Sequence, residues 1–326
     1  MATRNPQFTY RPFNDGDIDD FIDIIKAIRR NEGEPELVNR DEIMHQIHNP
    51  LIDFDRDTEV ALHNGRMVAM GFAAMLPTGQ AMGQETIHPD YEDEALRAYF
   101  VTTGEDRIRA RFDEIPAEKP IYIFRGAQEK HTNRLDLYEV HGYKEIRRFY
   151  EMKIDFDDSA ITVPELPDGI EFRPFEAEKH AEAVWYAHQE SFRDHFGYVE
   201  DRPFDQWRHS LLDTPTFDAS LWVIAWDGDE VAGVALNEVD SSEEATGHVN
   251  ILGVRRAWRK RGLGGVMLRH SFRLFQERGF KHVNLGVDAS SKTNAVALYE
   301  NAGMYVNKCM VQKRKILRGD EADIVD

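Results

Sequence analysis

The sequence has 326 residues, 41% of them hydrophobic, and a formal net charge of −19. This acidic balance excludes the basic stripe that general nucleic-acid binding requires. The single cysteine, Cys309, excludes an intramolecular disulfide, and no run approaches the ~18 apolar residues of a membrane span. The start MATRNPQFTYRPF lacks the apolar core of a signal peptide, so we expect a soluble, cytoplasmic protein.

The chain contains an internal repeat. Residues 10–25 (YRPFNDGDIDDFIDII) match residues 172–187 (FRPFEAEKHAEAVWYA) at an offset of 162. Farther along, residues 133–143 (NRLDLYEVHGY) match residues 294–304 (NAVALYENAGM) at an offset of 161. Two separate matches at nearly one offset predict two tandem domains.

The acids and prolines of DFDDSAITVPELPDG suit an extended connector between the two copies. We therefore divide the chain into an N-terminal domain, a linker, a second domain and a short tail. These are residues 1–156, 157–169, 170–318 and 319–326.

Each copy opens with a short strand that precedes an amphipathic helix. In the first copy the strand FTYRPF is followed by apolar residues at helical spacing, namely Ile18, Phe21, Ile22 and Ile25. Next, β-rich runs flank a tight turn, Asn64-Gly65 in the first copy and Asp227-Gly228 in the second. Both dipeptides are strong signals for a hairpin.

The second half of the second copy alternates strands with helices. The strand HVNILGV leads into the loop WRKRGLGG and a helix to about Arg278, and the strand HVNLGV precedes a helix that ends at Gly303. A last strand covers YVNKCMVQKRKI. This order predicts an α/β fold of mixed, α+β-like character, with two tandem domains that each have a mostly antiparallel mixed sheet flanked by helices.

The glycine loop is suited to hold a diphosphate. It lies at a strand-to-helix junction, where backbone N–H groups and the helix dipole favour an anion. Gly262 and Gly264 let the backbone approach closely, and Arg259, Lys260 and Arg261 add positive charge.

Other phosphate motifs fit less well. A Walker loop requires Gly-Lys-Ser/Thr, but Val266 and Met267 follow the glycines here. A dinucleotide fingerprint requires a third glycine where Met267 stands. A plain basic turn is the remaining alternative from the loop alone.

The loop also has the pattern Arg/Gln-x-x-Gly-x-Gly/Ala, as Arg259-x-x-Gly262-x-Gly264. In this it resembles the acyl-CoA pyrophosphate loop of the GNAT superfamily of N-acyltransferases. An apolar residue, Val254, stands five positions before Arg259, as in that family. NAVALYENAGM resembles the family's second motif, with Asn294 and Tyr299 at matching places. The resemblance covers nearly all of the second copy and, more weakly, the first.

The resemblance implies an N-acetyltransferase that uses acetyl-CoA as co-substrate and no metal. It implies that the pantetheine arm lies along the strand that ends at Val254. The residues implied to bind the cofactor are Leu252, Val254, Arg259, Lys260, Arg261, Gly262, Leu263, Gly264, Gly265, Asn294 and Tyr299.

The first copy departs from this pattern in its loop. Aligning IHPDYEDEALRAY with VRRAWRKRGLGGV puts residues 92–94, Glu-Asp-Glu, on the three cations and Arg97 on Gly264. Carboxylates repel a diphosphate, and Arg97 carries a Cβ where bare backbone is wanted. We expect a degenerate first copy that keeps the fold without the cofactor site, as in tandem members of the superfamily with one working half.

Three side chains are candidates for proton transfer. The resemblance places Tyr299 where the family often keeps the acid for the thiolate, although Tyr138 persists in the degenerate copy and a packing role is the alternative.

His248 stands where the family often carries a glutamate base. Strand alternation puts it on one face with Asn250 and Leu252. A histidine, with a reference pKa of ~6.5, can take the ammonium proton; Glu238 is the rival base, and a hydrogen-bonded strand histidine is the alternative.

The acceptor is expected to be a primary amine on a small molecule. Asp194 and His195 follow the first helix of the second copy, where the superfamily builds its acceptor wall, and are candidates to bind it; surface-loop residues are the alternative. We expect Cys309 to be packed rather than nucleophilic. Two other functions remain open: acylation of a protein or peptide amine, and non-catalytic acyl-CoA sensing or scaffolding. No nucleic-acid or membrane partner is expected.

Overall fold

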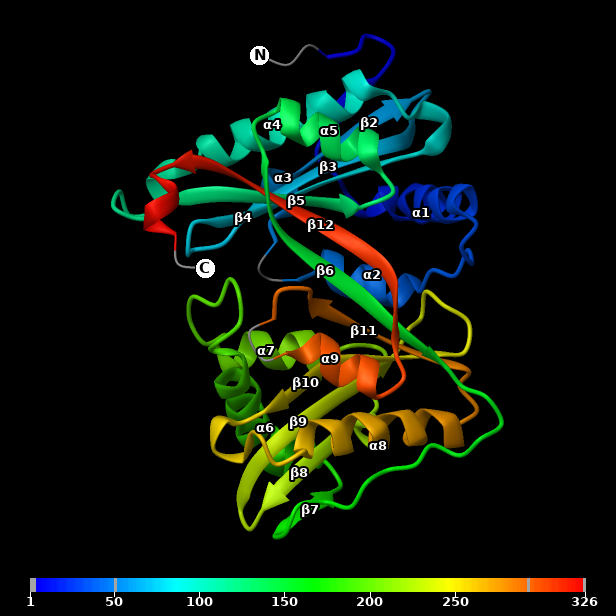
Figure 1. The fold of residues 1–326 in the computed structure, drawn as a ribbon. Coiled ribbons are helices and arrows are strands. Elements are labelled where there is room, and N and C mark those ends of the chain that lie inside the picture. The colour runs from blue at the N-terminus through cyan, green and yellow to red at the C-terminus, as the bar shows by residue number, and fades with distance from the viewer. Residues whose placement is uncertain (1–3, 50–51, 292–293, 325–326) are drawn as a thin grey trace. The chain divides into compact units, whose positions relative to one another are not determined.

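The computed structural model describes residues 4–49, 52–291 and 294–324, and Figure 1 shows the fold. The chain forms two compact units. Unit 1 comprises Met1–Arg147 with Met310–Val325, and unit 2 comprises Arg148–Cys309. We describe each unit by itself.

Unit 1 has a sheet in the order β1-β2-β3-β4-β5-β12, in which β4 and β5 are parallel and the other neighbours are antiparallel. The strands are β1 (Thr9–Arg11), β2 (Thr58–His63), β3 (Arg66–Met75), β4 (Gln80–Ile87), β5 (Ile121–Gln128) and β12 (Tyr305–Arg318). The helices are α1 (Ile18–Glu32), α2 (Arg40–Ile47), α3 (Phe54–Asp57), α4 (Glu94–Arg109) and α5 (Thr132–Val140). α1 and α2 pack on one face of the sheet, and α4 and α5 on the other.

Unit 2 repeats this plan in the order β6-β11-β10-β9-β8-β7, with β10 and β11 parallel. The strands are β6 (Lys144–Asp155), β7 (Ile170–Arg173), β8 (Val223–Asp227), β9 (Glu230–Val239), β10 (Thr246–Val254) and β11 (His282–Asp288). The helices are α6 (Ala177–Phe192), α7 (Phe204–Leu211), α8 (Leu263–Glu277) and α9 (Ala295–Asn301).

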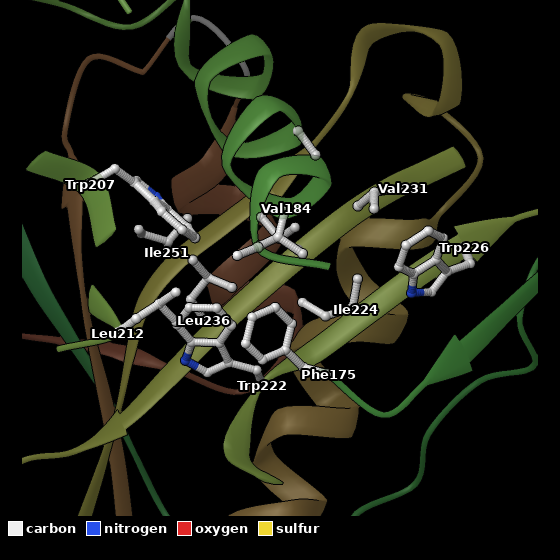
Figure 2. Close-up of a cluster of buried hydrophobic side chains, with 13 residues drawn as sticks. Phe175, Val184, Trp207, Leu212, Trp222, Ile224, Trp226, Val231, Leu236 and Ile251 are labelled. Atoms are coloured by element: carbon white, nitrogen blue, oxygen red, sulfur yellow. The ribbon is translucent and has the colours of Figure 1, made fainter. Parts of the chain in front are cut away.

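Helices cover both faces of the unit 2 sheet. α6 and α7 pack on one face. There Val184 of α6 and Trp207 of α7 contact Leu236 and Ile251 of the sheet, together with Trp222, which directly precedes β8 (Figure 2). α8 and α9 pack on the other face, through two further apolar clusters. The predicted mixed α/β fold with a mostly antiparallel sheet and flanking helices is therefore confirmed.

The last strand of each sequence copy pairs with the sheet formed by the other copy. β6 comes at the end of the first sequence copy, yet residues 149–155 pair with β11 of unit 2. β12 comes at the end of the second copy, yet residues 310–318 pair with β5 of unit 1. The compact units therefore differ from the division expected at residue 156, because repeat matching follows chain order and carries no information on which strands pair.

The tight turns follow from local chemistry. β2 and β3 are joined through Asn64 and Gly65, which both have positive φ, 52° and 82°, as a type I′ hairpin turn requires. β8 and β9 are joined through Gly228 and Asp229, and here only Gly228 has positive φ, 56°. Across the described ranges, none of the helices is long and apolar enough to cross a membrane.

Candidate functional site

The glycine loop is fastened to the end of α6. The Arg259 guanidinium donates to the Val254 carbonyl at 3.0 Å, to the Ser191 carbonyl at 2.9 Å and to Asp194 at 2.9 Å. Asp194 also accepts from Arg256 at 2.5 Å. The hydrogen bonds from Arg256 and Arg259 lower the pKa of Asp194 to about 2. The structure thus places Asp194 against the loop arginines, and Arg259 holds the loop in place.

The exposed positive charge of the loop belongs to Lys260 and Arg261. Both side chains are exposed, and neither has a partner among the residues that the structure describes. Gly262, with φ 80°, is the N-cap of α8, and no side chain caps the helix. The first N–H groups of a helix have no intrahelical acceptor, so those of Leu263 and Gly264 are available to an anion.

Protein packing does not explain the glycine at position 264. A Cβ there meets only ordinary contacts at 3.7 Å, and one on Gly265 meets Leu298 at 3.6 Å. The Gly265 N–H is bonded to the Gly262 carbonyl at 3.1 Å. The space left at these two positions is compatible with the close approach of a diphosphate.

The strands β10 and β11 diverge beside this loop. Their parallel ladder ends at His248 and Asn284, although β10 continues to Val254 and β11 to Asp288. β9 and β6 still hold the outer sides of these strands beyond that point. Within the described residues, the facing backbone groups of β10 and β11 therefore have no strand partner there, which suits a ligand that lies along β10.

A β-bulge at Asn250 changes which residues share a face of β10. Val249 pairs with Asn237 and Ile251 with Leu236, so Asn250 is an extra residue. The prediction that His248, Asn250 and Leu252 share one face is therefore wrong, because the bulge shifts the alternation by one.

After the bulge, the side chains of Leu252 and Val254 pack with α8, whereas Ile251 faces α6 and α7. His248 lies on the α6 side, because Gly247 beside it faces Phe275 of α8.

His248 belongs to a row of polar side chains on that face. It lies opposite Glu238 of β9 and opposite Asn284 of β11. Its Nδ1 is 2.5 Å from the Asn284 Oδ1, and the Asn284 Nδ2 donates to Asp240 at 2.8 Å. The structure therefore brings both proposed bases, His248 and Glu238, together.

Tyr299 lies on the opposite side of the sheet, in the cluster of α8 and α9. It is 7% exposed, and burial raises its pKa to about 12. None of the described residues forms a hydrogen bond with its hydroxyl. Asn294, at the N-terminus of α9, is exposed and has left-handed φ of 57°.

His195 follows α6 and is half-buried against Phe192, with ring centroids 4.2 Å apart. Burial lowers its pKa, with Arg259 acting in the same direction and Asp288 against it. Seven residues earlier, on α6, the Nδ1 of His188 accepts from the Trp207 indole at 2.8 Å. Burial lowers the pKa of His188 to about 4. Both imidazoles are therefore neutral at physiological pH.

In unit 1 the helix that matches α8 is α4, and carboxylates of the protein itself lie at its N-terminus. Asp93 caps α4 by accepting from the Ala95 N–H at 3.2 Å. The Glu92 carboxylate accepts two hydrogen bonds of 2.7 Å from Arg97, which is 4% exposed.

The strands of unit 1 also diverge, where the ladder of β4 and β5 ends at Met82 and Phe124. There a buried Arg125–Glu85 ion pair follows. The groups that would meet a ligand in unit 2 are thus replaced by internal ion pairs.

Sequence reasoning did not single out Asn284, Asp240 or His188. One signal was present: Asn284 interrupts an otherwise apolar strand, HVNLGV, and a buried amide requires partners. Its partners come from β10 and from the end of β9, so they are not visible in the local sequence. Among the described residues, no group of three or more His, Cys, Asp and Glu could hold a metal ion.

Comparison with known proteins agrees with this geometry. The model of the acetyltransferase (GNAT) family matches residues 181–304. The mycothiol acetyltransferase of Pseudarthrobacter chlorophenolicus is 24% identical over 299 residues, which cover 87% of this chain and 88% of that protein.

Two solved structures are similar over nearly the whole chain. A GCN5-related N-acetyltransferase from Sphaerobacter thermophilus is 27% identical, with a TM-score of 0.79, and the match covers 97% of this chain and 98% of that chain. A tandem GNAT protein from the clavulanic acid biosynthesis pathway is 14% identical, with a TM-score of 0.70 and coverage of 96% and 100%, and shares the fold. The chain is therefore an acyltransferase with a GNAT acetyltransferase domain, in the tandem GNAT arrangement.

Proposed function

We propose that the protein transfers an acetyl group from acetyl-CoA to a primary amine on a small molecule, and that unit 2 carries out the reaction. The contrast between two helix N-termini carries this proposal. α8 has no side-chain cap and adjoins the exposed cations Lys260 and Arg261. α4 is capped by Asp93. Only the first arrangement suits an external diphosphate.

The cofactor is proposed to bind in two parts. The N–H groups of Leu263 and Gly264 meet the diphosphate, with Lys260 and Arg261 adding long-range attraction. The backbone of Leu252 and Val254, beyond the end of the β10–β11 ladder, meets the pantetheine arm. Arg259 acts indirectly, since its guanidinium is bonded to the protein on three sides.

Unit 1 is proposed to bind no acyl-CoA. Its equivalent of Gly264 is Arg97, whose guanidinium is bonded to Glu92. Its diverging strands hold the buried Arg125–Glu85 pair. Breaking a buried pair by removing one partner costs about 3–5 kcal/mol, so these groups are not displaced readily by a ligand.

Acetyl-CoA would supply a thioester, whose C–S bond breaks as the amine nitrogen forms a C–N bond. The ammonium nitrogen loses two protons in all: one before attack, which finally reaches solvent, and one after attack, which ends on the departing sulfur. His248 is the proposed acceptor of the ammonium proton, and Glu238, directly opposite it on β9, is the alternative. Tyr299 is proposed to donate its hydroxyl proton to a hydrogen bond with the sulfur. With a pKa of about 12 it stays protonated at neutral pH, while full transfer to a thiolate of pKa ~8.5 is uphill.

The two groups lie on opposite faces of the sheet, which supports approach of the amine from the α6 side and of the sulfur from the α8 side. His195, on the α6 side, is a proposed contact for the acceptor. Asp194 is proposed to orient Arg259 and Arg256 rather than to bind the acceptor, because its two oxygens are bonded to these arginines.

The acceptor class rests on the relatives. The name mycothiol acetyltransferase, carried by the relatives that match the chain, supports a small-molecule acceptor. The net charge of −19 mildly favours a cationic one.

An acetyl-CoA-dependent thiol-release assay over a panel of small primary amines and lysine peptides tests the function. We expect turnover with small amines and none without an acceptor. Turnover with peptides alone would contradict the small-molecule acceptor, and no turnover with any amine would contradict amine acetylation.

The same assay separates the two bases. His248→Ala should lower kcat/KM roughly 10²-fold and remove the fall in rate at acidic pH, while acetyl-CoA binding is unchanged. Glu238→Gln should leave kcat/KM and the pH profile nearly unchanged. If Glu238→Gln lowers kcat/KM and His248→Ala does not, the base is Glu238.

A further inference from the structure

Three polar side chains on one face of unit 2 form a chain of hydrogen bonds that ends on His248. The Asp240 carboxylate accepts from the Asn284 Nδ2 at 2.8 Å, and the Asn284 Oδ1 lies 2.5 Å from the Nδ1 of His248. Asn284 is only 3% exposed, so its amide depends on these partners.

The charge state of Asp240 determines which group donates and which accepts in each hydrogen bond between Asp240, Asn284 and His248. Burial acts to raise the pKa of Asp240, but hydrogen bonds from the Ser242 hydroxyl and Asn284 outweigh it, and the pKa is lowered. An ionised carboxylate only accepts, so the Asn284 NH₂ must face it and the amide oxygen must face His248. The Nδ1 of His248 then carries the hydrogen, and its Nε2 keeps a lone pair.

Charged groups around this chain are balanced. Glu238 faces His248 from β9, and Lys153 of β6 faces Asn284 from the other side. The Lys153 ammonium is 3.3 Å from Glu243, which also lies 3.5 Å from Lys308. The positive charges next to Asn284 are therefore compensated by Glu243.

Unit 1 shows what the same sheet positions look like without this chain. Both ladders end at equivalent pairs, His248–Asn284 in unit 2 and Met82–Phe124 in unit 1. The strand pairing on the other side likewise aligns Asp240 with Leu76. Apolar residues thus occupy all three equivalent positions in unit 1. The sheet can therefore form without the three polar side chains.

We propose that Asn284 and Asp240 are positioning residues, which hold His248 as the Nδ1–H tautomer with Nε2 free to take the proton of the acceptor ammonium. This rests on the proposed function. In the step, the ammonium loses one proton to Nε2 and its nitrogen gains the lone pair that attacks the thioester. His248 becomes an imidazolium that keeps its Nδ1–H bond to Asn284, and Asp240 stays ionised. The proton leaves to solvent afterwards.

The tautomer is measured without any substrate. Nitrogen-15 NMR of the histidine rings in the full chain reports which nitrogen carries the hydrogen, and His248→Gln assigns the signal. We expect the Nδ1–H form in the wild type. In Asp240→Asn the Asn284 amide is no longer oriented, so the Nε2–H form should appear and kcat should fall roughly 10–100-fold, with unchanged acetyl-CoA affinity.

The double variant Asp240→Asn/Asn284→Asp is the sharper test. It exchanges the amide and the carboxylate at constant charge, so Asp at position 284 accepts the Nδ1–H directly. We expect the Nδ1–H signal and most of kcat to return. The acidic limb of the pH profile should move to higher pH, because a carboxylate now contacts the imidazolium.

Asp155→Asn is the matched control. Asp155 lies 2.6 Å from the Nδ1 of His282, two residues before Asn284 on the same strand, and its change should leave the His248 signal and kcat unaltered. An Nε2–H signal in the wild type, or an unchanged tautomer and rate in Asp240→Asn, would overturn the proposal. If the wild type acetylates no amine, the proposed function fails, and the NMR results alone decide whether Asn284 and Asp240 set the tautomer.

Discussion

The Tyr138 hydroxyl donates a 2.7 Å hydrogen bond to the Glu85 carboxylate in unit 1, and both side chains are buried. Tyr299 holds the matching place in unit 2, where none of the described residues forms a hydrogen bond with its hydroxyl. The same residue type is thus part of an internal polar network in one copy and lacks such a network in the other. Tyr138 therefore has a structural hydrogen bond in unit 1, whereas for Tyr299 the acid role and the packing role both stay predictions.

Tyr299→Phe should lower kcat about tenfold, because the departing sulfur loses a hydrogen-bond donor. Acetyl-CoA affinity and the melting temperature should hardly change, since no described partner is left without its bond. Tyr138→Phe is the control: it should cost about 1–2 kcal/mol of stability and leave kcat alone. Steady-state kinetics, calorimetry and thermal melting check this, and an unchanged kcat in Tyr299→Phe would assign Tyr299 to packing.

Acetyl-CoA should bind once per chain, in unit 2. Titration calorimetry should give a stoichiometry of one, and Gly264→Glu should abolish binding by placing a carboxylate at the α8 N-terminus. Asp93→Ala, which removes the cap of α4, should cost about 1 kcal/mol of stability without changing the stoichiometry. Two equivalent sites, or one that survives Gly264→Glu, would contradict this prediction.

The cations of the loop should separate into two classes. Lys260→Ala and Arg261→Ala should weaken acetyl-CoA binding a few-fold, less so at high salt, and leave the melting temperature unchanged, because exposed charges act weakly and are screened. Arg259→Ala should also lower the melting temperature, since three bonds to Val254, Ser191 and Asp194 are lost. Equal melting temperatures for all three variants would show that Arg259 does not hold the loop.

The stability of unit 2 should fall in weak acid through His188. Its pKa is lowered by burial to about 4, against ~6.5 for an unfolded histidine. Between these values the unfolded chain binds a proton that the folded chain does not, so the free energy of unfolding decreases as pH drops from ~6.5 to about 4, by roughly 1–3 kcal/mol in total. His188→Gln should flatten this part of a denaturation series; parallel curves for variant and wild type would rule the assignment out.

The sequence predicted the features that depend on local chemistry. Asn64 and Gly65 form the hairpin turn because both positions require positive φ, which asparagine and glycine adopt more easily than other residues. The glycine loop lies at a strand-to-helix junction, as expected. The sequence could not show the bulge at Asn250, because the extra residue is defined only by the pairing of β10 with β9. Nor could it show that Arg259 is bonded to α6, or that Asn284 links His248 to Asp240, since these partners lie 68, 65, 36 and 44 residues away in the chain.

The strand exchange affects how the chain can be made. Residues 310–318 complete the sheet of unit 1 beside β5, so a ribosome must translate almost the entire message before the first half can close. Until then the β5 edge offers unpaired N–H and C=O groups, which are templates for aggregation. A truncation after residue 156 would leave the first half without its last strand and remove β6 from the sheet of the second half. Expression of either half alone should therefore give insoluble protein, whereas co-expression of both halves can supply each with its missing strand.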